Sequence, residues 1–309
     1  MLSTGLLEHL RHTMPAARIT VACGPVAAGL FARLPGLDRI LVVEKRRYDL
    51  HWLSLWRACA TTRWDLAIDL RGSAVTLLLP ARRRAIMRGG RRPGHRVVHL
   101  GGVLGLVPPP VPVVWTDPAD DARADALLPV GRTLIALGPT ANWTGKIWPA
   151  ERFAALFERL REAMPDAVPV VFAGPGPAEH ALGQALMDRL AGAIDLRGHL
   201  SLPEVAACLR RCALYVGNDS GLMHLSAATG IATLGLFGPS RASEYAPVGP
   251  RAAFVAAPGP AGEAPMDGLD VDTVASAALA LLARFPPQDT GWTTACPPMT
   301  ASNPCKSLP

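Results

Sequence analysis

Residues 213–240 read ALYVGNDSGLMHLSAATGIATLGLFGPS, and the pattern in this stretch decides the fold. A short apolar run is broken by the polar tetrapeptide GNDS, a run of helix length follows, and after Gly230 the sequence becomes β-rich. This order predicts a strand, a helix and a second strand. Ser220 or Asp219 suits the N-cap of the helix, and Gly230 suits the left-handed residue that follows its last turn.

The predicted helix begins directly after a strand, so its free N–H groups and partial positive charge lie at the carboxyl end of the sheet. The ligand that such a helix start favours is an anion, usually a phosphate. An ordinary buried strand–helix–strand unit would show the same apolar pattern. A purely structural unit would not need several polar residues where the first strand ends and the helix begins. Here that position carries Asn218, Asp219, Ser220 and His224.

The chain is long enough, at 309 residues, for two domains that each bury a core of their own. Half of the residues are apolar and few are aromatic, which is typical of an Ala- and Leu-rich α/β protein. No run approaches the roughly 18 uncharged apolar residues of a membrane-spanning helix. Charged residues interrupt positions 1–13, where a signal peptide needs an apolar stretch, so we expect a cytoplasmic protein.

The cysteines and the basic residues narrow the class of partner. The six cysteines show no C-x-x-C pair and no metal-binding spacing, so we expect them to be reduced and structural. Much of the net charge of +6 comes from the arginine-rich stretch 82–96. Such a stretch is a solvated face in most proteins, but it also suits anionic lipid headgroups or a phosphorylated glycolipid. No aromatic residues interleave with these arginines, so nucleic acid is not an expected partner.

Strands and helices are predicted to alternate along the chain, which indicates doubly wound parallel sheets. The predicted strands cover residues 18–23, 39–43, 64–70, 133–137, 168–173, 213–216 and 231–237. The predicted helices cover residues 2–13, 26–34, 50–61, 150–164, 178–190, 203–211, 221–229 and 271–284.

The domain boundary is predicted from composition. A proline-rich segment, 107–112, and an acidic segment, 117–125, look like a link between two domains, 1–125 and 126–285. The remaining residues, 286–309, are polar and contain prolines without periodicity, so we expect a disordered tail.

Three polar loops follow predicted strands in the second half of the chain: residues 140–146, 174–179 and 218–224. In an open parallel sheet these strand ends gather at one crevice, where ligands bind. Lys146 offers a compact positive charge to a diphosphate. A cradle of backbone N–H groups is expected from Ser220, Gly221 and Leu222.

Two residues of these loops have alternative interpretations. Glu179, at a predicted helix start, either stabilises the helix dipole or holds ribose hydroxyls as carboxylates do in dinucleotide folds. His224 lies one helical turn after Ser220 and is either a packing residue or part of the site. The chain has no G-x-G-x-x-G after a strand, no G-x-x-x-x-G-K-[ST] and no H-E-x-x-H. These absences argue against a dehydrogenase, a P-loop NTPase and a zinc protease.

Several segments together resemble a known family. The segments are KIWP at 146–149, GNDSGLMHL at 217–225 and LFGP at 236–239. With their spacing, they resemble glycosyltransferase family 9, the ADP-heptose:lipopolysaccharide heptosyltransferases. The likeness is strong over residues 133–250 and continues more weakly upstream, for example in DLAIDLRG at 65–72.

The resemblance implies a GT-B architecture of two Rossmann-like domains, with the acceptor on the N-terminal side and a nucleotide-activated sugar, ADP-heptose, on the C-terminal domain. It implies inverting, metal-independent transfer of a heptose or related sugar, without a cofactor, to a lipopolysaccharide core or similar glycan. Lys146 would neutralise the diphosphate, and Asp219 would hold hydroxyls of the transferred sugar. The other matching positions are Thr140 and Thr144 beside Lys146, Glu179 at the ribose, and Ser220, Gly221, Leu222 and His224 at the phosphates.

The chain departs from the family at its start. The family begins with a strand and a Gly-Asp turn whose aspartate is the catalytic base, and Met1 stands where that turn should end. We therefore expect an N-terminal sheet that lacks its first strand, and we favour a start assigned too late over a degenerate copy. Asp69, at the end of a predicted strand, is the one candidate replacement for the base, and a structural role is favoured for it.

Three functions remain open from the sequence. The first is an active transferase whose acceptor is a lipid-linked glycan, with the stretch 82–96 helping the protein to lie on the cytoplasmic face of the inner membrane. The second is an impaired homologue that binds the nucleotide sugar without transferring it. The third is a nucleotide-sugar epimerase of the same GT-B shape.

Overall fold

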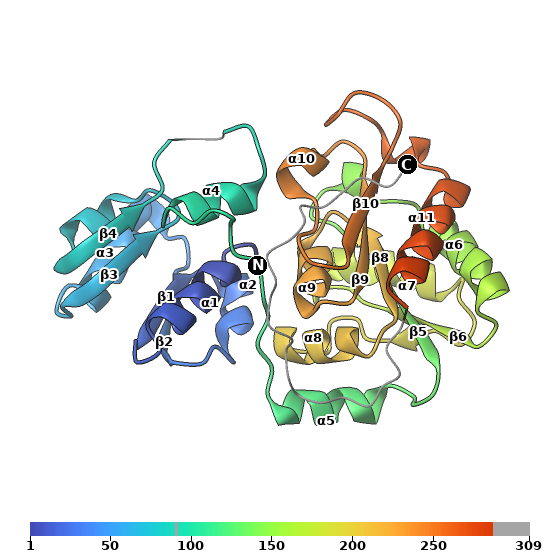
Figure 1. Ribbon diagram of the computed structural model, residues 1–309, viewed down its shortest axis with the longest axis horizontal. Helices are drawn as coiled ribbons and strands as arrows, with labels where there is room; N and C mark the ends of the chain where they lie inside the picture. Colours follow the sequence, from blue (N-terminus) through green and yellow to red (C-terminus); the bar gives the residue numbers. More distant parts are fainter. Residues whose placement is uncertain (90–91, 287–309) are drawn as a thin grey trace. The chain divides into compact units, whose positions relative to one another are not determined.

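A computed structural model describes residues 1–89 and 92–286 of the 309-residue chain (Figure 1). The chain divides into two compact units, Met1–Trp115 and a second unit that begins at Thr116. Both units are α/β, with parallel strands and helices that alternate along the chain, as the sequence predicts. The predicted tail, 286–309, lies outside the described residues except for its first position.

The division between the units lies after Trp115, ahead of the predicted boundary at Asp125. The acidic segment between these two positions forms a helix, α5 (Pro118–Leu127), where the sequence pattern indicated a linker. Arg210, at the end of α8 (Leu202–Arg210), donates a hydrogen bond to Asp121 at 2.7 Å. This contact and the packing of α5 on α8 explain why α5 belongs to the second unit.

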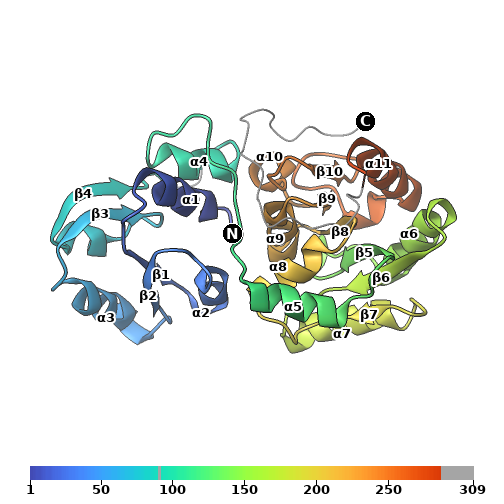
Figure 2. The same ribbon diagram turned by 60° about the horizontal axis from the view of Figure 1, so that its bottom comes forward.

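The second unit is built on a six-stranded parallel sheet in the order β10-β9-β8-β5-β6-β7. Its strands are β5 (Thr133–Gly138), β6 (Ala167–Val171), β7 (Ile194–Asp195), β8 (Leu214–Asn218), β9 (Ala232–Phe237) and β10 (Ala252–Ala256). The chain runs outward from β5 to β7, crosses back to β8 and then runs outward the other way to β10 (Figure 2). The order reverses between β5 and β8, and open α/β sheets bind ligands at this point.

Helices cover both faces of this sheet (Figure 1). They are α6 (Ala150–Ala163), α7 (Pro177–Met187), α8, α9 (Gly221–Thr229) and α11 (Val271–Arg284), and the short α10 (Ala242–Tyr245) lies between β9 and β10 in the chain. α6 contacts α11 on one face and α8 contacts α9 on the other, as right-handed crossovers require. β8 and β9 are buried along their whole length, and fully buried Trp148 and Phe153 pack in the same core.

β8, α9 and β9 confirm the strand–helix–strand unit that the sequence predicts. Ser220 is the N-cap of α9, and its Oγ accepts a long hydrogen bond of 3.5 Å from the Met223 N–H. Gly230 has a φ of +86°, which is the left-handed conformation expected after the last turn. The free N–H groups of α9 therefore lie at the carboxyl end of the sheet, beside β8.

The first unit holds its four strands as two separate parallel pairs. β1 (Ile19–Cys23) pairs with β2 (Leu37–Val42), and β3 (Trp64–Asp69) pairs with β4 (Ala81–Ile86). No ladder joins the two pairs within the part of the chain that the structure describes. Their residues are mostly half-buried or exposed, because each pair keeps free edges.

Short helices and turns surround these pairs. They are α1 (Thr4–Thr13), α2 (Pro25–Ala28), η1 (Gly29–Phe31), η2 (Arg47–Asp49), α3 (Leu50–Cys59), η3 (Ala74–Leu78) and α4 (Arg96–Gly102). The end of the unit is tied to α1, because the Val113 N–H donates to Thr4 Oγ1 at 2.9 Å and Trp115 Nε1 donates to Glu8 at 3.0 Å. Among the described residues, no helix has both the length and the apolar character needed to span a bilayer.

Candidate active site

Lys146 and Asp219 meet where the strand order reverses. Lys146 ends the 3₁₀ turn η4 (Thr144–Lys146) in the loop after β5, and Asp219 directly follows β8. Lys146 Nζ donates to Asp219 Oδ2 at 2.6 Å. The Asp219 side chain is 6% exposed and that of Lys146 is 21% exposed, so water screens this ion pair less than a surface pair.

Asn218, fully buried, fixes the loop that carries Lys146. Its Nδ2 donates to the Pro139 carbonyl at 2.9 Å, where the loop leaves β5. Its Oδ1 accepts from the Trp148 N–H at 3.1 Å, where the loop approaches α6. Both ends of the loop are therefore attached to the end of β8, which places Lys146 relative to Asp219. The sequence showed Asn218 as one member of a polar cluster but not as this clamp.

No protein atom of residues 1–89 and 92–286 fills the space next to the first residue of α9. Because Asp219 directly precedes the N-cap Ser220, its contact with Lys146 brings that ammonium group to the same helix start. A Cβ on Gly221 would meet no atom within 4 Å. The first N–H groups of α9, with those of Gly221 and Leu222 among them, border this open space and favour an anion. His224 lies one turn further on, and its N–H donates to the Ser220 carbonyl at 3.4 Å.

Glu179 lies at the end of β6, the strand beside β5, in the first turn of α7. Its carboxylate folds back over the preceding turn: a Cβ added to Gly174 would lie 2.3 Å from Glu179 Oε2. Within the described residues the Glu179 carboxylate has no hydrogen-bond or ion-pair partner, so it is not bonded to the Lys146–Asp219 pair. The carboxylate therefore keeps its capacity to accept hydrogen bonds from a ligand.

The two threonines of the Lys146 loop are placed differently. Thr140 is buried directly after β5. Thr144 is exposed at the start of η4, close to Lys146 in the chain. The structure thus brings together Lys146, Asp219 and Ser220 of the predicted site, and it places Thr140, Thr144 and Glu179 on neighbouring strand ends. Their roles toward a ligand remain predictions.

Asp69 has a structural role at the end of β3. Its carboxylate accepts five hydrogen bonds, from the N–H groups of Arg71, Gly72 and Ser73 and from the hydroxyls of Ser73 and Thr76. Burial alone would raise the pKa of Asp69, but these hydrogen bonds outweigh burial and hold the pKa below its usual value. A carboxylate stabilised in this way is a poor proton acceptor, which supports the structural role expected for Asp69.

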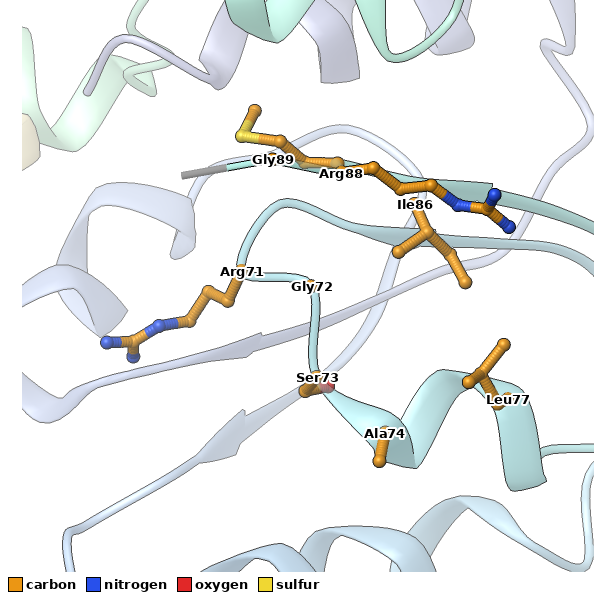
Figure 3. A pocket seen from close by; sticks show the side chains of 9 residues that line it. Arg71, Gly72, Ser73, Ala74, Leu77, Ile86, Arg88 and Gly89 are labelled. Atoms are coloured by element: carbon orange, nitrogen blue, oxygen red, sulfur yellow. The ribbon is translucent and has the colours of Figure 1, made fainter. Parts of the chain in front are cut away.

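A cavity of about 650 Å³ lies in the first unit, at the carboxyl ends of β3 and β4 (Figure 3). Leu77 and Ile86 give it apolar walls, and Ser73 lies on the turn that Asp69 orders. Arg71 and Arg88 stand at its rim with their guanidinium groups pointing in opposite directions (Figure 3). The sequence indicated Arg88 only as part of the basic stretch.

The cysteines of the described residues are free thiols. Burial raises the pKa of Cys208 to about 12 and raises that of Cys212 further, so both are unreactive as nucleophiles. Among the described residues no group of three or more His, Cys, Asp or Glu side chains is placed to hold a metal ion.

Comparisons with known proteins identify the family and the fold. Residues 103–264 match glycosyltransferase family 9 (heptosyltransferase). The chain is 23% identical over 295 residues to lipooligosaccharide heptosyltransferase 2 of Haemophilus influenzae, covering 82% of this chain and 84% of that protein.

Solved structures show the same fold. A family 9 glycosyl transferase from Veillonella parvula superposes with a TM-score of 0.78 at 21% identity, covering 92% of this chain and 93% of that one. The E. coli ADP-heptose lipopolysaccharide heptosyltransferase II superposes with a TM-score of 0.74 at 20% identity, covering 92% and 95%. The fold is therefore GT-B. Because the family match spans more than half of its length, the chain belongs to glycosyltransferase family 9.

Proposed function

We propose that this chain transfers a heptose or a related sugar from a nucleotide-diphosphate sugar, with ADP-heptose as the expected compound, to a lipopolysaccharide core or similar surface glycan. The observation that carries the proposal is the Lys146–Asp219 pair, held at 2.6 Å beside the open start of α9. A cation and a set of free N–H groups at the switch point of an α/β sheet suit a diphosphate.

The chemical step follows from the charge that develops on the leaving group. An acceptor hydroxyl attacks the anomeric carbon from the side opposite the diphosphate and loses its proton to solvent water as the new bond forms. The bond from that carbon to the diphosphate oxygen breaks, and the configuration inverts. Lys146 and the N–H groups of α9 stabilise the departing nucleoside diphosphate, which keeps the electron pair of the broken bond. Asp219 holds Lys146 in place and accepts hydrogen bonds from sugar hydroxyls. No resident cofactor or metal enters this scheme.

The remaining predicted residues surround this centre. The Glu179 carboxylate, in the first turn of α7 after β6, has no bonding partner among the described residues, and we assign it to the ribose hydroxyls. Thr144 is exposed beside Lys146 and is assigned to the diphosphate, with Thr140 supporting the start of the same loop. Ser220, Gly221 and Leu222 contribute the amides, and His224 lines the next turn of α9.

The first unit, Met1–Trp115, is proposed as the acceptor side. Its cavity at the ends of β3 and β4 combines apolar walls with arginines at the rim, which suits a charged glycan attached to a lipid. Arg82 and Arg83 on β4 are exposed, as are Leu77 and Leu78 on η3. We propose that this surface contacts anionic lipid at the cytoplasmic face of the inner membrane, where the protein would act peripherally.

Turnover and binding measurements on Lys146 variants test the proposal. Lys146→Ala should lower the transfer rate from ADP-heptose by ~10²–10³-fold, the effect typical of removing one preorganised donor at a developing charge. Lys146→Arg keeps the charge and should retain part of the activity. Lys45→Ala removes an exposed lysine of the first unit and should leave the rate unchanged. In this assay the acceptor supplied is a lipopolysaccharide that lacks core heptose.

The same experiment separates the alternatives. ADP-heptose binding measured by calorimetry without any transfer product would indicate an impaired homologue. Release of free nucleotide in the absence of an acceptor would indicate an epimerase. The family match and the named relatives favour neither alternative. A wild-type chain that binds neither ADP nor ADP-heptose would contradict the proposed function.

A further inference from the structure

The hydroxyl of Tyr215, near the carboxyl end of β8, has no hydrogen-bond partner among the described residues. Tyr215 is on β8, its side chain is fully buried, and its Oη pairs with no polar atom of the described residues. A buried hydroxyl without a partner destabilises a fold, and native proteins keep few of them. Phenylalanine would fill the same space without this cost, so the hydroxyl itself calls for an explanation.

Two glycines make room for this hydroxyl. Gly138 on β5 and Gly217 on β8 are register partners at the carboxyl end of the sheet. A Cβ on Gly138 would lie 2.0 Å from Tyr215 Oη, and a Cβ on Gly217 would lie 2.4 Å from it. Neither glycine has a positive φ, so backbone conformation does not require glycine there. Glycine is required at both positions because the Tyr215 ring packs against them, with its hydroxyl toward the carboxyl ends of the strands.

The polar group that Tyr215 approaches is Ser220, the N-cap of α9. Burial raises the pKa of Tyr215, and the nearby Ser220 side chain opposes part of that rise, although the two hydroxyls stand outside hydrogen-bond geometry. The phenol therefore keeps its proton at neutral pH. Ser220 Oγ accepts only the long bond from Met223 and donates no bond within the described residues. Each of the two hydroxyls thus has a proton to donate.

We propose that Tyr215 is a positioning residue of the diphosphate site that acts through Ser220. When an anion occupies the start of α9, Tyr215 Oη donates its proton in a hydrogen bond to Ser220 Oγ, and Ser220 directs its own proton at a phosphate oxygen. Each hydroxyl donates one bond and no proton is transferred. The chain of two hydrogen bonds satisfies both groups only when the ligand is present. This inference rests on the proposed function, because it requires a diphosphate at that position.

Isosteric removal of the hydroxyl tests the inference. Tyr215→Phe keeps the ring over Gly138 and Gly217 and should leave the unfolding temperature of the ligand-free protein unchanged or raised. Its dissociation constant for ADP, measured by calorimetry, should increase about two- to tenfold, the order expected for the loss of one hydrogen bond between two neutral hydroxyls. Tyr48→Phe, at an exposed tyrosine of the first unit, is the matched control and should bind ADP like the wild type.

A double-mutant cycle identifies the route of the effect. Ser220→Ala should also weaken ADP binding, and adding Tyr215→Phe to it should cost nothing further, because the relay is already broken. Additive losses of affinity in the double variant would overturn the relay. The relay would also be overturned if Tyr215→Phe bound ADP as tightly as the wild type. A loss of affinity in Tyr215→Phe accompanied by a lower unfolding temperature would overturn it as well. If the wild type binds ADP but one of these contrary results is obtained, the relay is wrong and the proposed function still stands. A wild type that does not bind ADP overturns both.

Discussion

Asp219 and Asn218 are neighbours in the chain and act on the same loop in different ways. Asn218 attaches both ends of the loop to β8, and Asp219 holds the ammonium group of Lys146. The motif predicted Lys146 and Asp219, and the structure brings them together. The clamp of Asn218 and the hydroxyl of Tyr215 were not predicted, because their roles depend on contacts between strands distant in sequence. Tyr215 reads in the sequence as one more apolar strand residue.

Gly221 offers a second test of where the ligand lies. It is the first residue of α9, and a Cβ there meets no protein atom within 4 Å. Gly221→Ala should therefore leave the unfolding temperature unchanged or slightly raised, since alanine favours helices over glycine. ADP affinity should fall at least about tenfold, because the methyl group enters the space assigned to the diphosphate. Calorimetry measures the affinity, with Gly102→Ala in the last turn of α4 as control. Unchanged ADP binding by Gly221→Ala would place the ligand elsewhere.

Some helices and strands can be predicted from their own sequence pattern, whereas others form because of contacts with neighbouring elements. The predicted helix 271–284 coincides with α11, whose apolar residues recur at helical spacing. β4 was missed because ARRRAI has three consecutive arginines and no apolar alternation, and its strand conformation comes from pairing with β3. α5 was read as a linker, although its contact with α8 stabilises it as a helix.

The surface formed by η3 and β4 gives a prediction at this scale. Arg84 donates to carbonyl oxygens of η3, β4 and the connection between them, so it holds the turn. Arg82 and Arg83 are exposed, and Arg82 also forms an exposed ion pair with Asp65 on β3 at 3.4 Å. Leu77 and Leu78 of η3 are 60% and 68% exposed. The double variant Arg82→Ala/Arg83→Ala should lose most co-sedimentation with anionic phospholipid vesicles, since each arginine near such a surface contributes about 1 kcal/mol.

The control for this measurement is Arg159→Ala/Arg161→Ala, which removes two half-exposed arginines from α6 in the second unit. It should sediment with the vesicles like the wild type. High salt should release the wild type, because the attraction is screened. If the wild-type chain does not co-sediment with anionic vesicles at low salt, the proposed membrane contact is excluded.

The two units differ in how completely they bury their strands. The core of the second unit joins its sheet, α6 and α11 in one cluster of buried residues. In the first unit the two strand pairs are separate and mostly half-buried or exposed. Sequence alternation predicted α/β structure for both, but it could not show this difference, because burial depends on which strands find partners. The first unit should therefore be the less stable of the two.

Differential scanning calorimetry should show two transitions, with the first unit unfolding at the lower temperature. The proposed ADP site lies entirely in residues of the second unit, so ADP should raise only the upper transition. At an ADP concentration of 100 times Kd, linkage gives about 2.7 kcal/mol of added stability, which corresponds to roughly 5–10 °C for a domain of this size. Lys146→Ala should reduce this shift, because it weakens the binding that produces it. Equal shifts of both transitions would mean that ADP also contacts the first unit, and a shift of the lower one alone would move the nucleotide site there.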